Sequence, residues 1–269
     1  MPPQLALLLC TAFVLFLLRL DRKQVGAVSS AMWIPTLWML LIASKPLGVW
    51  FGSVSDTADT EGSPLDRSFL IATLCVGLVL LARRRFDWSK VMREHVWLML
   101  LLGWALVSLL WSESPFICFK RWIRELVAVI MGCLVLTEPA PAKAVQTIIR
   151  RTVYILIPFS ILLIKYYPRY GVAYGQFSGE QMWVGVTLQK NSLGRLCLIS
   201  VFFLIWTLVR RWQGREIHGS KWQPYAEIMV IAQALFLMKG PNNMAYSATA
   251  TASLALGIAT FGSLLWMKK

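Results

Sequence analysis

The sequence predicts an all-α, polytopic transmembrane helical bundle with about nine spans, and its composition carries this prediction. The chain of 269 residues is 57% hydrophobic and contains 13 Trp, and its mean hydropathy is +0.61. A soluble domain of this length cannot bury so much apolar surface. The sequence lacks the alternating strands of about ten residues that are typical of membrane barrels, so the spans are expected to be helices. Residues 1–269 are therefore predicted to be a single transmembrane domain without a soluble domain.

Apolar runs along the chain define the expected spans. The first is interpreted as a retained helix, because no basic region precedes it and no small-residue cleavage site follows it. Pro35, Pro46 and Pro158 are expected to bend or end the helices that contain them. The nine runs are Leu5–Leu18, Ala31–Trp50, Ser68–Ala82, Val96–Trp111, Trp122–Leu136, Val153–Tyr167, Ser192–Val209, Pro224–Met238 and Ala248–Trp266.

The positive charge follows membrane topology rather than a nucleic-acid surface. The formal net charge is +14, but the Lys and Arg residues lie in short blocks between apolar runs. Seventeen of the 27 cations fall in five segments that alternate with the others, so these five segments are expected to be cytoplasmic. This assignment places the N-terminus outside and the C-terminus inside, and it makes the acidic linker 52–66 external.

Ten cations remain on the predicted outer side or within the membrane near it. Topology gives no reason to keep them there, and an intramembrane charge costs roughly 2.5–3.5 kcal/mol on insertion scales. Such residues usually face a partner or a polar cavity. They are Lys45, Arg67, Lys120, Arg121, Arg124, Lys165, Arg169, Lys190, Arg195 and Lys239.

The segment Tyr166–Gly194 is the most distinctive external stretch, because glycines and aromatic residues alternate along it. Asn191 or Ser192 is expected to cap the following helix, whose free N–H groups beside Lys190 would form an anion site. The aromatic residues can stack on sugar rings or form the interfacial belt. An ordinary glycine-rich connector is the alternative interpretation. Within the stretch, Glu180 is the carboxylate best placed to act as a base, and a solvated loop glutamate is the alternative.

A second group of charges, Lys120–Leu126, is predicted to open the fifth span. Arg121 and Glu125 are four residues apart, so they are expected to form an ion pair on one helix face. Lys120 and Arg124 form a like-charged pair at the same spacing and would repel unless an anion lies between them. Interfacial side chains that reach toward water are the alternative.

Other catalytic chemistry has little support in the sequence. The five Cys lie in or beside apolar runs without a Cys-x-x-Cys pair, so we expect packing thiols rather than a metal site or disulfides. Both histidines fall in predicted cytoplasmic loops. The sequence shows no hydrolase triad and no nucleotide-binding loop, so neither a metal nor a cofactor is expected.

Several motifs together resemble the O-antigen ligase and O-antigen polymerase family, nearest its exopolysaccharide-production branch. The run Trp183–Leu198 is similar to the family's Lys-Asn-x-Leu-Gly signature, and Pro168–Gly171 resembles its arginine–glycine element. Trp111–Pro115 with Lys120-Arg121, and Tyr246–Thr249, resemble two further elements. Many ligases carry an Arg just after the serine of the last of these elements, which corresponds to Ser247. This chain has Ala248 at that position.

The resemblance implies an inner-membrane glycosyltransferase of Gram-negative bacteria that needs no metal or nucleotide. Such proteins transfer an undecaprenyl-diphosphate-linked glycan to an acceptor hydroxyl, on a polysaccharide or lipid, at the periplasmic face. Arg169 and Glu180 are then the candidate catalytic residues. The candidate binding residues are Lys120, Arg121, Arg124, Lys190, Asn191 and Arg195.

One departure leaves the enzyme assignment open. Family members run to about a dozen spans, with a histidine-bearing external loop beyond the region that matches the ninth span, and this chain has no predicted external His. The resemblance therefore implies a truncated member that is inactive alone, a partial gene product, or a relative with no chemistry of its own. The alternative is a non-catalytic membrane protein, such as an anion transporter or channel subunit.

Overall fold

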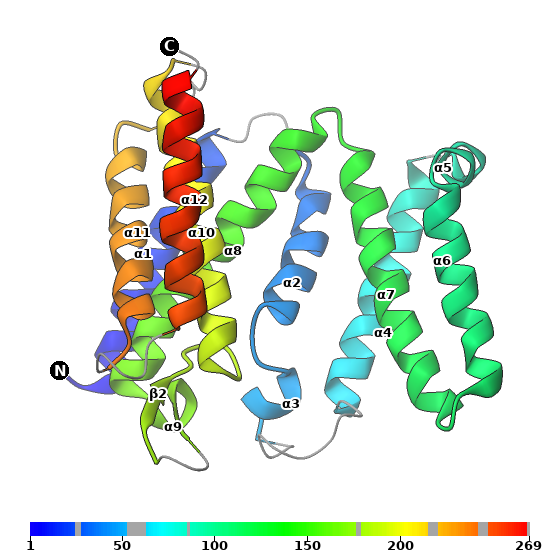
Figure 1. Cartoon of the computed structure of the whole chain (residues 1–269), viewed down its shortest axis with the longest axis horizontal. Helices are drawn as coiled ribbons and strands as arrows, with labels where there is room; N and C mark the ends of the chain where they lie inside the picture. The colour runs from blue at the N-terminus through cyan, green and yellow to red at the C-terminus, as the bar shows by residue number, and fades with distance from the viewer. Residues whose placement is uncertain are drawn as a thin grey trace. The chain divides into compact units, whose positions relative to one another are not determined.

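The computed structural model describes residues 1–24, 28–52, 63–84, 87–175, 179–214, 220–241 and 247–267, and it is dominated by helices (Figure 1). Every predicted apolar run is helical for most of its length. The elements are α1 (Pro3–Gln24), η1 (Ser30–Met32), α2 (Trp33–Ile42), α3 (Leu47–Trp50), α4 (Pro64–Arg83), α5 (Trp88–Glu94), α6 (Val96–Val107), η2 (Ser108–Trp111), α7 (Pro115–Leu136), α8 (Pro141–Tyr166), α9 (Pro168–Gly171), β1 (Val172–Tyr174), β2 (Gln181–Trp183), α10 (Lys190–Trp212), α11 (Gln223–Lys239) and α12 (Ala248–Met267).

Among the described residues, four helices are long and apolar enough to cross a membrane, namely α1, α4, α8 and α10. The pair α5 and α6–η2 passes the same test together but is bent by 91°, which raises the number to five. These helices indicate a membrane protein, whereas the expected count of nine spans is not supported. The described helix α7 carries four charged residues between Lys120 and Glu125, and α11 has only 17 residues.

Of the prolines that were expected to bend or end helices, Pro46 lies at a break and Pro158 does not end its helix. The second run is divided between Ile42 and Leu47, and Pro46 is the residue that precedes α3. A proline lacks the N–H that would continue the helix, so the expected break occurs there. Pro158, by contrast, lies inside the continuous helix α8 and does not end it.

The chain folds into two compact units, and each is considered by itself. The first unit comprises Met1–Gly26, Ile42–Lys45 and Ile149–Lys269, and the second comprises Ala27–Leu41 and Pro46–Ile148. In the first unit α10 packs against α11 and α12, and α1 packs against α11 (Figure 1). Its apolar core includes Leu17, Tyr154, Ile157, Leu193, Cys197, Val201, Leu204, Val230, Ala234 and Leu237.

In the first unit, chain segments that are predicted to lie on the same side of the membrane are found at the same end of the helices. The end of α8, the start of α10, the end of α11 and the N-terminus of α1 lie at one end, which is the lower end in Figure 1. The end of α1, the end of α10 and the start of α11 lie at the other. We call these the hairpin end and the arginine end, after the residues described below.

Close helix packing in the first unit depends on a glycine. A Cβ atom at Gly194 of α10 would lie 2.5 Å from Ser247 Oγ and 3.0 Å from the Cβ of Ala250 in α12. Ser247 is itself buried. The start of α12 and the residue before it therefore pack closely against α10 at Gly194.

In the second unit, α4 packs against α7 around a separate apolar core. One end of this unit is held by Glu138, which follows α7. Glu138 forms an ion pair of 2.6 Å with Arg84 and accepts hydrogen bonds from the hydroxyl and the backbone N–H of Ser29. Arg84 also donates to Thr137 at 2.6 Å. Three connections that are predicted to share a side therefore meet at one buried carboxylate.

We expect Glu138→Gln to destabilise the protein by about 1.5–3 kcal/mol, because it removes the charge that strengthens the contact with Arg84 and the two hydrogen bonds from Ser29. Burial by itself raises the pKa of Glu138, but the hydrogen bonds from Ser29 and Arg84 and the charge of Arg84 outweigh burial, so the pKa is lowered. A lowered folded-state pKa stabilises the protein above the unfolded-state value of about 4.3, and this contribution is lost as the pH falls through the folded-state pKa.

Thermal unfolding of purified wild type and variant at pH 7 and at stepwise lower pH tests this expectation. The difference in Tm should be largest near neutral pH and should shrink below pH of about 4. A difference that stays constant down to the acid limit of folding would show that the charge of Glu138 contributes nothing.

Candidate functional site

The hairpin end of the first unit is built from the segment between α8 and α10. After α8 ends at Tyr166, the single turn α9 leads into β1, which pairs antiparallel with β2 in the register Val172↔Trp183, Ala173↔Met182 and Tyr174↔Gln181. The glycine-rich stretch is thus an ordered β-hairpin at its base. Phe177, one of the aromatic residues of this stretch, lies outside the described residues.

Gly171 fixes the base of the hairpin against α8. A Cβ atom at this position would collide with the backbone of Leu163 and Ile164, so only glycine allows the close approach. The Gly171 carbonyl accepts hydrogen bonds from the N–H groups of Val184 and Gly185, at 3.0 and 2.9 Å. Both strands of the hairpin are therefore attached to the end of α8 through one residue.

The segment between β2 and α10 is also fixed by close contacts. Gly185 has a φ of +53°, a conformation that favours glycine, and a Cβ there would lie 2.7 Å from the Cβ of Ser160. The Thr187 hydroxyl donates to the carbonyl of Val184 at 2.8 Å and also lies 3.0 Å from the carbonyl oxygen of Gln189. These contacts set the position at which α10 begins.

Lys45, one of the ten anomalous cations, has a structural role. Its ammonium group donates to the carbonyl of Tyr170 at 2.8 Å, and its backbone N–H donates to the carbonyl of Val186 at 2.8 Å. The side chain is only 3% exposed. A cation at the C-terminus of a helical turn is favourable, so Lys45 stabilises the hairpin from within.

The start of α10 differs from the expectation in one respect. The helix begins at Lys190, and its N-cap is Gln189, which makes no capping hydrogen bond with its side chain. The expectation that Asn191 or Ser192 caps the helix is therefore wrong, because both lie inside the first turn. Arg195 donates to the Ser192 hydroxyl at 3.2 Å.

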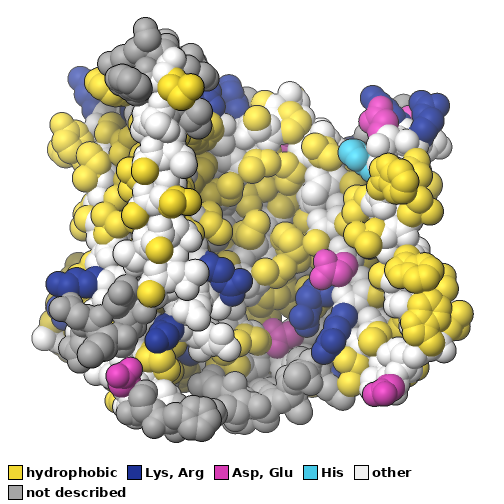
Figure 2. Space-filling view, viewed as in Figure 1, with side chains coloured by type: hydrophobic (Ala, Val, Ile, Leu, Met, Phe, Trp, Pro, Cys, Tyr) yellow, Lys and Arg dark blue, Asp and Glu magenta, His cyan; other side chains and the backbone are white. Residues whose placement is uncertain are grey.

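Charged side chains of the hairpin end are mostly accessible. Arg169, Asn191, Arg195 and Glu180 are exposed, and Lys190 is half-buried. Lys165 and Lys239 are also exposed at this end, and Figure 2 shows Lys and Arg side chains there, at the lower left of the view. Among the described acidic residues of the first unit, only Glu180 lies at this end. No ion pair to the cations named here is found within the described parts of the chain.

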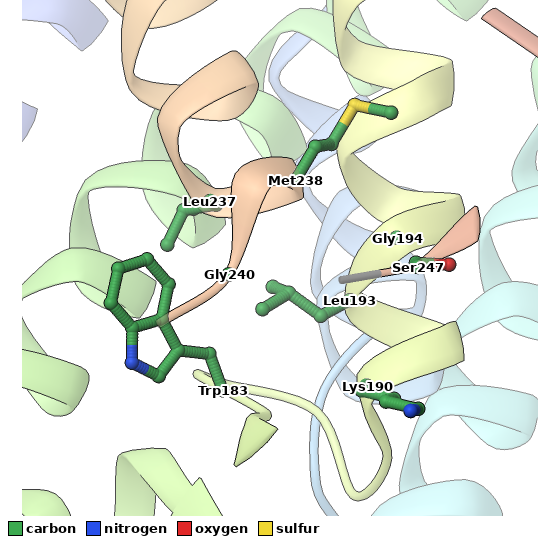
Figure 3. Close-up of a pocket in the computed structure, with 8 residues that line it drawn as sticks. All are labelled: Trp183, Lys190, Leu193, Gly194, Leu237, Met238, Gly240 and Ser247. Carbon is green, nitrogen blue, oxygen red and sulfur yellow. The ribbon is translucent and has the colours of Figure 1, made fainter. Parts of the chain in front are cut away.

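A pocket opens beside Lys190 (Figure 3). It is small: the volume that a water molecule can occupy in it is about 10 Å³, which is room for about one water. Trp183 and Leu237 lie on one side of the pocket and Lys190 and Ser247 on the other, with Leu193 between them. The remaining lining residues are Gly194, Met238 and Gly240. The pocket therefore joins one cation and one hydroxyl to an aromatic and aliphatic wall.

The second predicted group of charges lies in the second unit. Helix α7 begins at Pro115, so Lys120–Leu126 occupies its second and third turns rather than its opening. Lys120 lies over the ring of Phe116, with its Nζ 4.2 Å from the ring centroid. Arg121, Arg124 and Glu125 are exposed, and the predicted Arg121–Glu125 ion pair is absent among the described contacts. The motif Trp111–Pro115 leads into this helix, with Ser114 as the N-cap and Pro115 as the first helical residue.

Sequence reasoning missed the arginine end of the first unit. Glu227 of α11 is 0% exposed, and Arg150 of α8 is 2% exposed. Asp21 of α1 lies 2.9 Å from Arg151 and 3.5 Å from Arg150, and Arg150 lies 3.8 Å from Glu227. The sequence contained one sign of this cluster: an Asp, a Glu and paired arginines flank the apolar runs. The same pattern is typical of ordinary membrane topology, so it did not predict buried ion pairs.

No protein-family model, curated protein or solved structure matches the chain. Within the described residues, no group of three or more His, Cys, Asp or Glu side chains has the arrangement of a metal site. Function is therefore inferred from the hairpin end itself and from the resemblance of its motifs.

Proposed function

We propose that the chain binds a polyprenyl-diphosphate-linked glycan at the hairpin end and presents it for transfer to an acceptor hydroxyl. One observation carries the proposal: Arg169, Lys190 and Arg195 lie at the same end of the helix bundle, Lys190 lines the pocket, and none of the three has a carboxylate ion pair among the described residues. Cations kept near a membrane at a cost are expected to have an anionic partner.

The chemistry of the pocket suits a molecule that changes from polar to apolar along its length. A diphosphate accepts charge-assisted hydrogen bonds, which Arg makes with bidentate geometry and Lys as a point charge. Leu193, Leu237 and Met238 supply an apolar wall on the inner side of Lys190. The aromatic pair Trp183–Phe236, with ring centroids 5.2 Å apart, lies on the side of α11, where an isoprenoid tail in the bilayer would reach the pocket.

In the proposed transfer, an acceptor hydroxyl attacks the anomeric carbon of the first sugar and the diphosphate leaves. Arg169 would stabilise the charge that develops on the leaving diphosphate. Glu180 is the described carboxylate that could accept the proton of the attacking hydroxyl. In the second unit, Lys120, Arg121 and Arg124 are phosphate-binding candidates by the resemblance alone.

The same proposal includes location. The hairpin end would face the periplasm of a bacterial inner membrane, because the segments that carry most of the Lys and Arg of the first unit lie at its opposite end. The resemblance to O-antigen and exopolysaccharide proteins supports this placement. The product would then be an O-antigen or exopolysaccharide chain joined to a polysaccharide or lipid acceptor.

An anion transporter or channel is the rival interpretation, and the interior of the first unit gives it little support. Between Lys190 and Arg211, α10 buries Leu193, Cys197, Val201 and Leu204. These residues belong to the apolar core of the unit. The described part of this bundle therefore shows cations at two ends that are separated by apolar packing rather than joined by a polar path.

The test measures thermal stabilisation of the purified chain by undecaprenyl diphosphate in detergent. We expect Arg169→Ala and Lys190→Ala each to weaken the response, and Arg169→Lys to weaken it although the charge is kept, because Lys cannot make the bidentate contact. Loss of one charge-assisted contact corresponds to about tenfold in the half-maximal concentration.

Arg22→Ala is the matched control, since Arg22 is an exposed arginine at the arginine end. It should respond like the wild type. The proposal is wrong if the wild type shows no stabilisation, or if the Arg169, Lys190 and Arg22 variants all respond equally.

A further inference from the structure

The short helix α5 of the second unit presents a surface that the proposed function does not use. It follows α4, which is long enough to cross a membrane, and a single residue, His95, separates it from α6. The chain bends by 91° there, and the segment Val96–Trp111 beyond the bend contains no charged residue. When this apolar segment crosses the bilayer, α5 therefore lies along the membrane surface.

The residues of α5 are divided between an apolar and a polar side. At about 3.6 residues per turn, its three apolar residues fall on one side of the helix and its four polar residues on the other. The apolar residues are Trp88, Val91 and Met92, and the polar ones are Ser89, Lys90, Arg93 and Glu94. Val91 packs against the apolar core of the second unit, whereas Trp88 and Met92 remain 39% and 54% exposed. The apolar side is therefore directed toward the membrane part of the unit, and two of its residues are available to lipid.

Two tryptophans flank the bend. Trp97 in the first turn of α6 is 84% exposed, and Trp88 lies in the first turn of α5. Trp is enriched at the membrane–water interface because its ring is apolar and its N–H is polar. Their positions on the two sides of the bend support the placement of α5 at the level of the lipid headgroups.

The charges around α5 leave a positive surplus. Both carboxylates of the helix and its N-cap have local partners: Asp87 accepts a hydrogen bond from the N–H of Lys90 at 3.1 Å, and Glu94 lies 3.9 Å from the ammonium group of Lys90. Arg83 at the end of α4 and Arg93 are exposed, and neither has a carboxylate ion pair among the described residues. Figure 2 shows Lys and Arg side chains at this end of the second unit, at the upper right of the view.

We propose that α5 is an interfacial helix that binds the headgroup of an anionic phospholipid through Arg83 and Arg93, with Trp88 and Met92 among the acyl chains. Lys or Arg on a polar side and large apolar residues on the other are typical of helices in the membrane interface. A helix of seven residues binds weakly by itself, but α4 and α6 already hold α5 at the surface. Each cation near an anionic leaflet adds about fivefold in affinity.

Fluorescence quenching in the full chain tests which side of α5 faces the lipid. A fluorescent amino acid replaces either Met92 or Ser89 of the purified chain in lipid nanodiscs, so the native Cys residues stay unchanged. Iodide quenches it from the water, and a doxyl group on the acyl chain quenches it from the lipid. We expect the doxyl lipid to quench the fluorophore at position 92 and iodide to quench the one at position 89. An equal response of the two positions to both quenchers would overturn the proposed orientation.

The preference for anionic lipid is measured with the fluorophore at position 92. Doxyl-labelled phosphatidylglycerol is compared with doxyl-labelled phosphatidylcholine at increasing mole fraction in nanodiscs of phosphatidylcholine. Half-maximal quenching should need less phosphatidylglycerol, and Arg93→Gln should raise the required fraction about fivefold. The double variant with Arg83→Gln should remove most of the difference between the two lipids. Arg22→Gln, the exposed arginine of the first unit, is the control and should respond like the wild type.

Two results would overturn the lipid preference. One is equal quenching by the two labelled lipids in the wild type. The other is an equal response of Arg93→Gln and Arg22→Gln, which would show that phosphatidylglycerol follows the general charge of the protein. Both are read at α5 without undecaprenyl diphosphate, so failure here is distinguishable from failure of the diphosphate proposal.

Discussion

Arg150→Ala is expected to destabilise the protein by about 3–5 kcal/mol, the cost of breaking a buried ion pair by removal of one partner. Arg150 lies between Asp21 and Glu227 and is the nearest cation to the Glu227 carboxylate, at 3.8 Å. Its removal leaves a carboxylate that is 0% exposed without this counter-charge. Thermal unfolding in detergent, or the yield of folded protein where the variant does not accumulate, measures the effect.

Arg150→Lys and Arg22→Ala are the controls for this expectation. The lysine keeps the charge but not the planar geometry, so its effect should be intermediate, and the exposed Arg22 should tolerate alanine. An Arg150→Ala protein as stable as the wild type would show that the contacts of Arg150 with Asp21 and Glu227 contribute nothing to stability.

Gly171→Ala should disrupt the hairpin end, because the added methyl group collides with the backbone of α8 rather than with a movable side chain. Overpacking typically costs 1–3 kcal/mol, and we expect about 3 kcal/mol because backbone atoms cannot yield. The displaced carbonyl would also lose its hydrogen bonds from Val184 and Gly185. Stabilisation by undecaprenyl diphosphate should be lost together with the protein stability.

Gly103→Ala is the matched control, since no heavy atom lies within 4 Å of a Cβ built at Gly103 in α6. In a helix interior this change should be neutral or stabilising by about 1 kcal/mol. A Gly171→Ala chain that unfolds and binds like the wild type would show that the hairpin is not fixed against α8.

Most of the secondary structure was predictable from the sequence. Long apolar runs form helices because a backbone in an apolar environment must satisfy its own hydrogen bonds, and the break before α3 follows from Pro46. The number of spans was not predictable in this way. Runs such as Trp122–Leu136 belong to longer helices with charged turns, and apolar content alone does not reveal where such a helix lies.

The candidate site was predictable only in outline. The glycine-rich stretch and its cations identified the hairpin end, but neither the strand pairing nor the role of Lys45 could be foreseen, since Lys45 contacts Tyr170 across 125 residues of sequence. The ion pairs at the arginine end could not be foreseen for the same reason. Asp21 and Arg151 are 130 residues apart, and their pairing has no local pattern because it depends on the packing of α1 against the rest of the bundle.

Photo-crosslinking of the purified chain with a benzophenone-bearing polyprenyl diphosphate tests the central proposal most directly. The account predicts labelled peptides from the hairpin and the first turns of α10, within Tyr166–Leu198, with labelling reduced by excess undecaprenyl diphosphate and by Arg169→Ala. Labelling that is confined to peptides of the arginine end, or that is unaffected by both the competitor and Arg169→Ala, would contradict the proposed binding of a lipid diphosphate at the hairpin end.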